Sequence, residues 1–330
     1  MSASSNTVAV IGAGKVGAAV AHLLARAGHD VVVWARRTGA AAEIAQSASA
    51  DERVRTARSI AEACRGASLV TFAVPAHALR EAARAAGEVA DGAQVALHAC
   101  RGVDVHFALP HDVIRAETCI KKIAALGGPL YFDDLAQSGG RPLVAVVASR
   151  FDEVHRLVKA LVKNTQVRVH STHDVVGVEV AGAVSNVAHM AAGIAEGLGL
   201  GETDQGVLLT RGLVEAARIG GALGGERTTF AGLAGVGDLI PRPVTSTKRH
   251  RTLGAELGAP GKDAGAVLAL HKDVEGVSTA REAQALGKRL ELSLPLVDAV
   301  CDVLAGQPPR AVLERVLSLD LDIDGITATT

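Results

Sequence analysis

The chain has 330 residues, enough for two domains or one large domain, and it carries a formal net charge of −1. Such a chain lacks the basic field that draws proteins to nucleic acids or acidic lipids, and one Trp, one Tyr and five Phe leave little surface for base stacking. The composition therefore excludes a nucleic-acid-binding protein, and the abundance of Ala, Val, Leu and Gly suits helices and buried parallel strands.

The first predicted strand is followed by a glycine-rich turn. Val8 to Ile11 is a short apolar run, the next six residues have the pattern GxGxxG, a helical pattern follows to about Ala27, and Asp30 to Trp34 forms a second strand after a break at Gly28-His29. The first glycine permits a tight turn, the second lets a pyrophosphate approach the backbone, and the third lets the helix pack on the sheet. Free N–H groups and the positive dipole end of the helix favour phosphate there. The sequence thus predicts dinucleotide binding at Gly12, Gly14, Lys15, Val16 and Gly17.

The end of the second strand indicates which dinucleotide binds. A site specific for NAD usually holds Asp or Glu there for the ribose 2′-OH, whereas this chain has Ala35, Arg36 and Arg37. Two guanidinium groups suit a 2′-phosphate, so NADP is favoured and NAD stays open. The alternative is that one or both arginines are solvated surface residues.

Strands and helices continue to alternate as far as residue 173. A helix is predicted from about Phe151 to Lys163, and further strands are predicted at Ser68–Pro75, Gln94–Cys100, Ile120–Leu126, Pro142–Ser149 and Val167–His170. This alternation predicts an α/β fold, with an N-terminal doubly wound and mostly parallel sheet of the Rossmann type over residues 1–173. Residues 174–330 are predicted to form an all-helical domain, with breaks at Gly199–Gly201, Gly232–Gly237, Ala259–Gly261 and Gln307–Pro309.

The stretch from Asp174 to Gly201 is largely apolar, with Ala and Gly at most other positions, and it predicts a buried helix that another helix approaches closely. The polar residues set into it are Glu179, Ser185, Asn186 and His189. Buried polar groups cost free energy unless they are paired or used, so these residues are candidates for chemistry. Ser185 and His189 are four residues apart and share a helix face. The alternatives are that Ser185 is a small residue for close packing, and that His189 pairs with a backbone carbonyl or with Glu179.

Signals for targeting, membranes, metals and disulfides are weak. No basic residue precedes the first apolar run, and no stretch of about 20 apolar residues is free of charge or turn signals, so we expect a cytoplasmic protein with no membrane span. The four cysteines are far apart and form no CxxC, which predicts reduced and mostly buried thiols. No GxSxG elbow for Ser–His–Asp hydrolysis occurs. No metal site is predicted, because ligand spacing is lacking among His98, His106, His111, His170 and His173.

A series of motifs covers nearly the whole chain, in the order GAGKVG with VWARR, FAVPAHALR, ACRG, GGP, DVVGVEVAGAVSN, GIAEGLGLG, LLTRGLVEAARIGGALGG, TTFAGLAGVGDLI, KRHRTLG and VEGVSTA. These segments resemble those of the soluble NAD(P)-dependent glycerol-3-phosphate dehydrogenase family. The resemblance implies a Rossmann domain, a helical substrate and dimerisation domain, a homodimer and a role in glycerophospholipid metabolism. It also implies hydride transfer between nicotinamide and C2 of dihydroxyacetone phosphate, sn-glycerol 3-phosphate or a related anionic substrate.

Several positions depart from the family pattern. The family has a lysine that polarises or protonates the reacting oxygen where this chain has Ser185. A second family lysine, a serine and a threonine are replaced by Arg101, Leu130 and Arg242, and a Ser-Arg-Asn phosphate site is replaced by Lys248, Arg249 and His250. The dinucleotide half of the pattern is intact, as are Asn186, Asp238, Arg249 and Glu275.

The loss of the lysine bears directly on the chemistry. Reduction of a ketone develops negative charge on its oxygen, which a buried ammonium stabilises, and removing one such group commonly costs about 10²–10³ in rate. Three hypotheses stay open. In the first, the protein is a dehydrogenase in which His189 serves as acid or base, Ser185 relays the proton or holds the substrate, and Asp238 orients either group. The second is a dinucleotide-binding sensor or regulatory protein without redox activity, and the third is a standard enzyme with a local defect. Replacement at several pocket positions at once favours altered function over a local defect.

The predicted site residues fall into three groups. The catalytic group is Ser185, Asn186, His189 and Asp238; the cofactor group is Gly12, Gly14, Lys15, Val16, Gly17, Arg36, Arg37, Arg249 and Glu275; the substrate group is Arg101, Gly128, Asp238, Lys248, Arg249 and His250. The cationic run from Arg242 to Arg251 predicts a substrate more anionic than glycerol phosphate, unless Lys248 and Arg251 lie on a solvated face.

Overall fold

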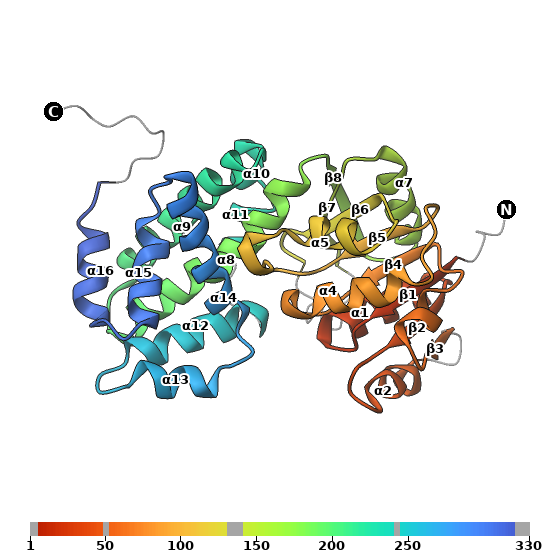
Figure 1. The fold of residues 1–330 in the computed structure, drawn as a ribbon, viewed down its shortest axis with the longest axis horizontal. Helices are drawn as coiled ribbons and strands as arrows, with labels where there is room; N and C mark the ends of the chain where they lie inside the picture. The colour runs from red at the N-terminus through yellow and green to blue at the C-terminus, as the bar shows by residue number, and fades with distance from the viewer. Residues whose placement is uncertain (1–5, 49–52, 131–140, 241–244, 321–330) are drawn as a thin grey trace. The chain divides into compact units, whose positions relative to one another are not determined.

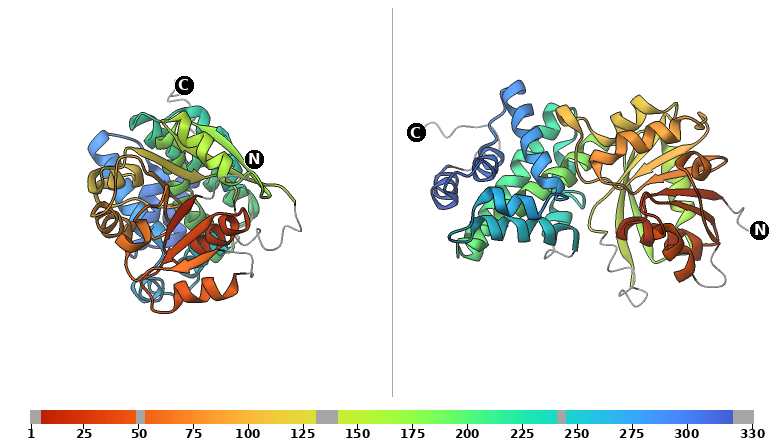
Figure 2. Two further views of the ribbon diagram at one scale, coloured as in Figure 1. Left: turned by 90° about the vertical axis from the view of Figure 1, so that its right-hand side faces the viewer. Right: turned by 60° about the horizontal axis from the view of Figure 1, so that its bottom comes forward.

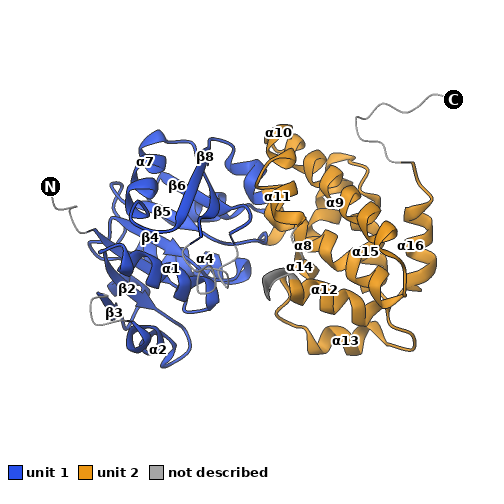
Figure 3. Cartoon of the chain, turned by 180° about the vertical axis from the view of Figure 1, so that it is seen from behind, with its two compact units in different colours: residues 1–104, 108–179 blue, residues 105–107, 180–330 orange. Residues whose placement is uncertain are grey.

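A computed structural model describes residues 6–48, 53–130, 141–240 and 245–320. The chain divides into two compact units (Figure 3). Unit 1 comprises residues 1–104 and 108–179, and unit 2 comprises residues 105–107 and 180–330. The sequence predicts a domain boundary at His173, whereas compactness assigns residues 174–179 to unit 1.

Unit 1 contains an eight-stranded sheet in the order β3-β2-β1-β4-β5-β6-β7-β8 (Figure 1). The strands are β1 Thr7–Ile11, β2 Asp30–Trp34, β3 Val54–Thr56, β4 Leu69–Phe72, β5 Val95–His98, β6 Lys122–Gly127, β7 Leu143–Ser149 and β8 Val167–Thr172. Every neighbouring pair is parallel except β6 and β7, which confirms the doubly wound, mostly parallel sheet. β3 is missing from the predicted strands because it has three residues, two of them exposed, and therefore no apolar run.

Helices cover both faces of this sheet (Figure 2). They are α1 Lys15–Arg26, α2 Ala40–Ser47, α3 Ile60–Cys64, α4 Ala76–Gly87, α5 Pro110–Glu117 and α7 Asp152–Leu161. The alternation of side chains along β1 explains the two layers, because Val8 and Val10 pack in one core with α1, α2 and α7, while Ala9 and Ile11 pack in another with α3, α4 and α5.

Different residues lie at the two edges of the sheet where its strands begin and end. The chain order reverses between β1 and β4, and ligands of such sheets bind at that reversal, beyond the carboxyl ends of the strands. Gly12, Arg36, Arg101 and Gly128 all follow strands that end at this edge. β7 and β8 run in the opposite direction, so α7 and the residue after β8 lie at the other edge.

The described residues of unit 2 are predominantly helical. Its elements are the short 3₁₀ helix η1 Val105–Phe107 and α8 Val175–Gly197, α9 Glu202–Ala222, α10 Arg227–Ala231, α11 Val236–Leu239, α12 Thr245–Gly258, α13 Ala264–Leu270, α14 Glu275–Leu290, α15 Pro295–Leu304 and α16 Pro309–Leu317. α8 begins in unit 1 and continues into unit 2. Helices end or begin at each of the four predicted breaks, which confirms a helical C-terminal region, whereas the breaks at residues 223–226, 271–274 and 291–294 were not predicted.

α8 is the central buried helix that its composition predicts. Within the described residues it is the one helix with the length and apolar composition to cross a membrane, yet 94% of its most apolar window is buried inside the protein. A core helix of a globular unit has the same properties, so the burial of α8 accounts for its composition.

The helix that approaches α8 is α12. A Cβ atom placed on Gly193 or Gly197 of α8 would lie 2.2 Å or 2.1 Å from a backbone oxygen of α12, at Arg251 and Ala255 respectively. The reverse holds for Gly254 of α12, whose Cβ would lie 2.1 Å from a backbone oxygen of α8. The two backbones therefore touch through glycine on both sides, which confirms the predicted close approach.

Candidate active site

Two glycines shape the turn between β1 and α1. Gly12 has a φ of 113°, and a Cβ placed on it would lie 2.5 Å from the carbonyl oxygen of Ala73. A Cβ on Gly17 would lie 1.8 Å from the carbonyl oxygen of Gly12. Neither distance is possible for a real side chain, so these positions require glycine for the turn and for the packing of α1.

Gly14 differs from its two neighbours in the pattern because no atom lies within 4 Å of its ideal Cβ position. The protein itself therefore does not require glycine there, and the open space lies at the N-cap of α1, where no side chain caps the helix. The first N–H groups of a helix without a cap bind anions. This combination of a tight turn, an open Gly14 and an uncapped helix fits a dinucleotide pyrophosphate.

The two arginines after β2 are in different situations. Arg37 donates two hydrogen bonds to the carboxylate of Glu43, at 3.0 Å and 2.8 Å, and both side chains are exposed. The hydrogen bond from Arg37, followed by its charge, lowers the pKa of Glu43. Arg36 is exposed and forms no ion pair with any described residue. Of the two arginines, Arg36 therefore has the guanidinium that is not committed to an ion pair.

Arg101 and Gly128 lie at the same edge of the sheet as the glycine turn. Arg101 is half-buried beyond the end of β5. Gly128 has a φ of 79°, and a Cβ there would lie 2.8 Å from Cγ2 of Val146. The positive φ and the contact with Val146 thus explain why residue 128 is glycine, independently of its predicted role in substrate binding.

A buried cluster in unit 1 surrounds Glu179 of α8. The backbone N–H of His111 donates to Oε1 of Glu179 at 2.8 Å, Nδ1 of the same histidine lies 2.6 Å from Oε2, and Nε2 of His98 lies 2.7 Å from Oε1. Burial raises the pKa of Glu179, but the hydrogen bond from His111, the close contact with His98 and the charges of both histidines together outweigh it and hold this pKa at about 2. Burial lowers the pKa of His111, but the hydrogen bond to Glu179 and the negative charges of Glu179 and Asp112 together outweigh it, so the pKa of His111 is raised. The cluster joins the end of β5, the start of α5 and the first turns of α8.

Sequence reasoning identified Glu179 as a buried polar residue and considered His189 as its partner. In the structure, Glu179 instead pairs with His98 and His111, two residues whose spacing was weighed only as evidence for a metal site. The one available signal was a histidine at the end of an otherwise apolar strand. Nothing local connects His98 or His111 to a helix that starts more than 60 residues later.

Three predicted catalytic residues of α8 are buried in unit 2. Ser185, Asn186 and His189 are 6%, 2% and 1% exposed. The hydroxyl of Ser185 has no hydrogen-bond partner among the described residues. A buried hydroxyl without a partner costs free energy, so Ser185 fits a position that contacts a ligand better than one selected for packing alone.

α8, α12 and α14 meet beside Asn186. The backbone N–H of Gly276, in the first turn of α14, donates to Nε2 of the buried His250 of α12 at 3.1 Å. A Cβ on Gly276 would lie 2.6 Å from Cδ2 of His250 and 3.5 Å from the carbonyl oxygen of Asn186. His250 thus joins α12 to α14, and Glu275, half-buried, is the residue at which α14 begins.

The cationic run lies mainly in helix α12 and is only partly available to a ligand. Lys248 and Arg249 are exposed. Arg251 bonds to Glu196 at 2.7 Å and also to Gln205, so it is occupied within unit 2. Arg242 lies outside the described residues. Asp238 is 1% exposed on α11.

Two family models match consecutive parts of the chain. The model of the NAD-dependent glycerol-3-phosphate dehydrogenase N-terminus matches residues 7–154, and that of the C-terminus matches residues 174–314. The chain belongs to this family. Membership places the protein among the NAD(P)-dependent oxidoreductases, and it agrees with the dinucleotide binding that the sequence predicts at the glycine turn.

Relatives in the glycerol-3-phosphate dehydrogenase family match over nearly their full length. The chain is 33% identical to a glycerol-3-phosphate dehydrogenase, NAD(P)+, of Halothermothrix orenii, over 95% of each chain. It is 37% identical to the corresponding protein of Burkholderia lata, over 95% of this chain and 98% of the relative. The crystal structure of glycerol-3-phosphate dehydrogenase from Coxiella burnetii superposes with a TM-score of 0.86 at 25% identity, over 96% of this chain and 99% of that one.

Proposed function

We propose that the chain interconverts a small phosphorylated ketone and its secondary alcohol with NADP(H), with NAD(H) as the second candidate cofactor. The substrate class is that of dihydroxyacetone phosphate and sn-glycerol 3-phosphate, as the names of its relatives suggest. The observation that carries the proposal is Ser185, a buried hydroxyl with no partner among the described residues, on a helix of a family member whose nucleotide turn is complete.

Unit 1 supplies the cofactor-binding residues of the proposal. The backbone around Gly14, with Lys15 and Val16 in the first turn of α1, holds the pyrophosphate, and Gly12 and Gly17 keep the turn in place. Arg36 faces the 2′-phosphate of NADP, and Arg37 has a lesser part because Glu43 holds it. Bound nicotinamide supplies the hydride.

Unit 2 supplies the catalytic residues of the proposal. The hydroxyl of Ser185 donates a hydrogen bond to the substrate oxygen on which charge develops, and Asn186 positions the substrate beside it. His189 lies one helical turn further along α8 and is the proposed proton donor, with Asp238 orienting it. Because a hydroxyl stabilises negative charge less than an ammonium does, we expect slower turnover than a lysine would give.

In the proposal, cationic side chains bind the anionic part of the substrate. Arg249 is the first candidate because it is exposed and matches the phosphate ligand of the family pattern, and Lys248 adjoins it on α12. Arg101 is the candidate in unit 1. Since Arg251 is held by Glu196, the run offers fewer cations than its sequence suggests, which favours a single phosphate over a more highly charged anion.

We also propose that the protein is a homodimer located in the cytoplasm. The support is the resemblance of the sequence motifs to the soluble dehydrogenase family, together with an apolar helix that is buried in the protein.

The test measures NADPH oxidation with dihydroxyacetone phosphate for the native chain, Ser185→Ala and Ser185→Lys, with NADPH affinity measured in parallel. Ser318→Ala, at an exposed serine after α16, is the matched control. We expect activity in the native chain, a loss of about tenfold or more in Ser185→Ala at unchanged NADPH affinity, and no change in Ser318→Ala.

Three outcomes would contradict the proposal. If the native chain and Ser185→Lys both bind NADPH but neither oxidises it with this ketone or other small phosphorylated ketones, the protein is a dinucleotide-binding sensor. If NADPH and NADH both fail to bind, the function of the glycine turn is refuted. Activity confined to Ser185→Lys would show that the pocket accepts the substrate and that Ser185 is not an effective catalytic group.

A further inference from the structure

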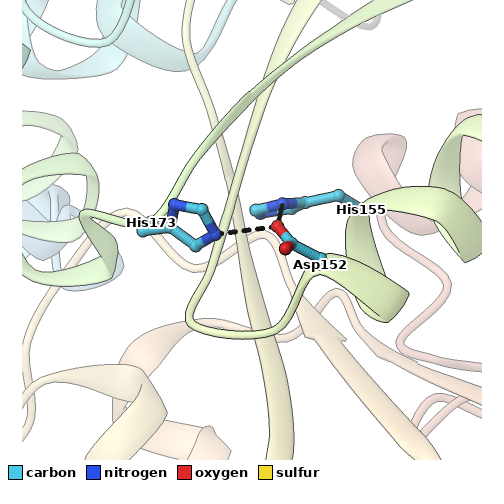
Figure 4. Close-up of side chains that lie close together, drawn as sticks. All are labelled: Asp152, His155 and His173. Carbon is cyan, nitrogen blue, oxygen red and sulfur yellow. Dashed lines mark hydrogen bonds and ion pairs between the residues drawn. The ribbon is translucent and has the colours of Figure 1, made fainter.

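Three side chains with metal-binding atoms converge in unit 1 (Figure 4). They are Asp152 in the first turn of α7, His155 one turn later, and His173 immediately after β8. Both imidazole rings face the same carboxylate: Nε2 of His173 lies 2.9 Å from Oδ1 of Asp152, and Nδ1 of His155 lies 3.7 Å from it. One ligand atom from each residue lies within 4.8 Å of those of the other two.

A backbone contact fixes the ring of His155 in the orientation that a metal ligand needs. Nε2 of His155 lies 3.0 Å from the carbonyl oxygen of Thr172 and donates a hydrogen bond to it, since a carbonyl only accepts. In the neutral ring this places the lone pair on Nδ1, which faces Asp152. Metal-binding histidines usually donate their other N–H to a carbonyl or carboxylate in this way, and this contact orients the ring.

The spacing suits a small divalent ion. Zn²⁺ bonds of about 2.0–2.2 Å in tetrahedral geometry put neighbouring ligand atoms about 3.3 Å apart. The measured distances of 2.9 Å and 3.7 Å lie on either side of that value. His155 is 8% exposed, whereas Asp152 and His173 are 71% and 61% exposed, which leaves room for water as a further ligand.

We propose that Asp152, His155 and His173 bind a divalent transition-metal ion, with Zn²⁺ the best match to two imidazoles and one carboxylate. The site would join the start of α7 to the segment that leads from β8 into α8, which stabilises the folded unit. It lies at the edge of the sheet opposite the glycine turn, because β7 and β8 run antiparallel to β6. The ion is therefore structural and takes no part in the proposed redox chemistry.

The alternative for this cluster is an exposed ion pair between Asp152 and His173 with no metal. Neighbouring cations, Arg156 and Lys159, oppose a metal ion, but both are exposed and screened by solvent. Surface ion pairs contribute little to stability, so the two hypotheses differ clearly in what added metal does.

The test uses the full-length chain without a histidine tag, treated with a chelator and then titrated with Zn²⁺ by calorimetry and with Co²⁺ by visible absorption. The titrations are repeated in Asp152→Asn and His173→Ala, which change exposed side chains and should leave the fold intact. His170→Ala is the matched control, because His170 is exposed on β8 and lies outside the cluster. All of these proteins carry Cys119→Ser, because Cys119 is an exposed thiol and thiols also bind Zn²⁺.

We expect one equivalent of Zn²⁺ per chain, a Co²⁺ spectrum with d–d bands, and an increase in Tm of about 5 °C or more at a hundredfold excess of free metal over Kd. Both cluster variants should weaken binding at least about tenfold and abolish the increase in Tm, while His170→Ala should do neither. Absence of saturable binding, or equal binding in native protein and His173→Ala, overturns the proposal in favour of the ion pair or of adventitious binding elsewhere. NADPH affinity should be the same with and without metal.

Discussion

Replacing Glu179 by glutamine tests whether the buried cluster of unit 1 is held by charge. The glutamine side chain has nearly the same shape, so the change removes the negative charge and leaves the packing of α8 in place. His98 and His111 then face an amide in a buried position. Removing one partner of a buried ionic group is costly because the remaining groups were desolvated for that interaction.

The size of the effect follows from the pKa of Glu179. A pKa held at about 2 instead of 4.5 corresponds to about 3 kcal/mol of preferential stabilisation of the carboxylate in the folded state, at about 1.4 kcal/mol for each unit of pKa. The same order of cost is typical of broken buried ion pairs. We therefore expect Glu179→Gln to lower the free energy of unfolding by about 3 kcal/mol at pH 6.

The stabilisation by the Glu179 cluster depends on pH. Because the pKa of Glu179 is lower in the folded state, its contribution is present above pH 4.5 and is lost as the pH falls towards 2. Because the pKa of His111 is raised above 6.5, its contribution is present below pH 6.5 and is lost as the pH rises through the raised value. The cluster stabilises most between pH 4.5 and 6.5, and the difference between native protein and Glu179→Gln should shrink by more than half at pH 3.

Urea unfolding followed by tryptophan fluorescence measures this difference. Trp34 is the single tryptophan of the chain and lies in β2, so its emission reports the unfolding of unit 1, to which Glu179 belongs. Glu81→Gln, the same chemical change at an exposed position on α4, is the control and should alter stability by less than about 0.5 kcal/mol. A loss below about 1 kcal/mol, or a loss that is constant from pH 3 to pH 6, would refute the reasoning from charge.

Substitutions of glycines and arginines test three separate features. Gly193→Ala should destabilise the folded protein by about 1–3 kcal/mol, because the new Cβ would lie 2.2 Å from a backbone oxygen of α12. Its control is Gly206→Ala, at an open and exposed position of α9, which should stabilise the protein by about 0.4–1 kcal/mol. Both values are measured by thermal unfolding, and similar values for the two variants would contradict the close helix crossing. Gly14→Ala should keep its Tm but weaken NADPH binding about tenfold or more in calorimetric titration, because the methyl group enters the space assigned to pyrophosphate; unchanged affinity would place the phosphate elsewhere. Arg36→Ala should weaken the binding of NADPH but not of NADH, and Arg37→Ala should have the smaller effect because its guanidinium is already paired; equal losses for both cofactors would argue against a 2′-phosphate contact.

Local features of the sequence were sufficient for much of the fold. The continuous apolar runs within Val8 to Ile11 and Asp30 to Trp34 identify strands, and the glycine spacing identifies the turn between them. The same holds for α8, whose apolar residues at helical spacing predict a buried helix and whose small residues predict a close neighbour. β3 was missed because its short, exposed strand has no such pattern.

The sequence by itself therefore determined the two-part architecture, the nucleotide turn and the family, because each depends on residues close together in the chain. Only the tertiary structure decided which side chains meet across long separations: Glu179 with His98 and His111, Arg251 with Glu196, and the two histidines that share Asp152. The physical reason is that periodicity states which face of an element is apolar, but not which other element packs on it. The reversal of direction at β7, which places α7 and the end of β8 together at one edge, is likewise a property of the assembled sheet and of no single segment.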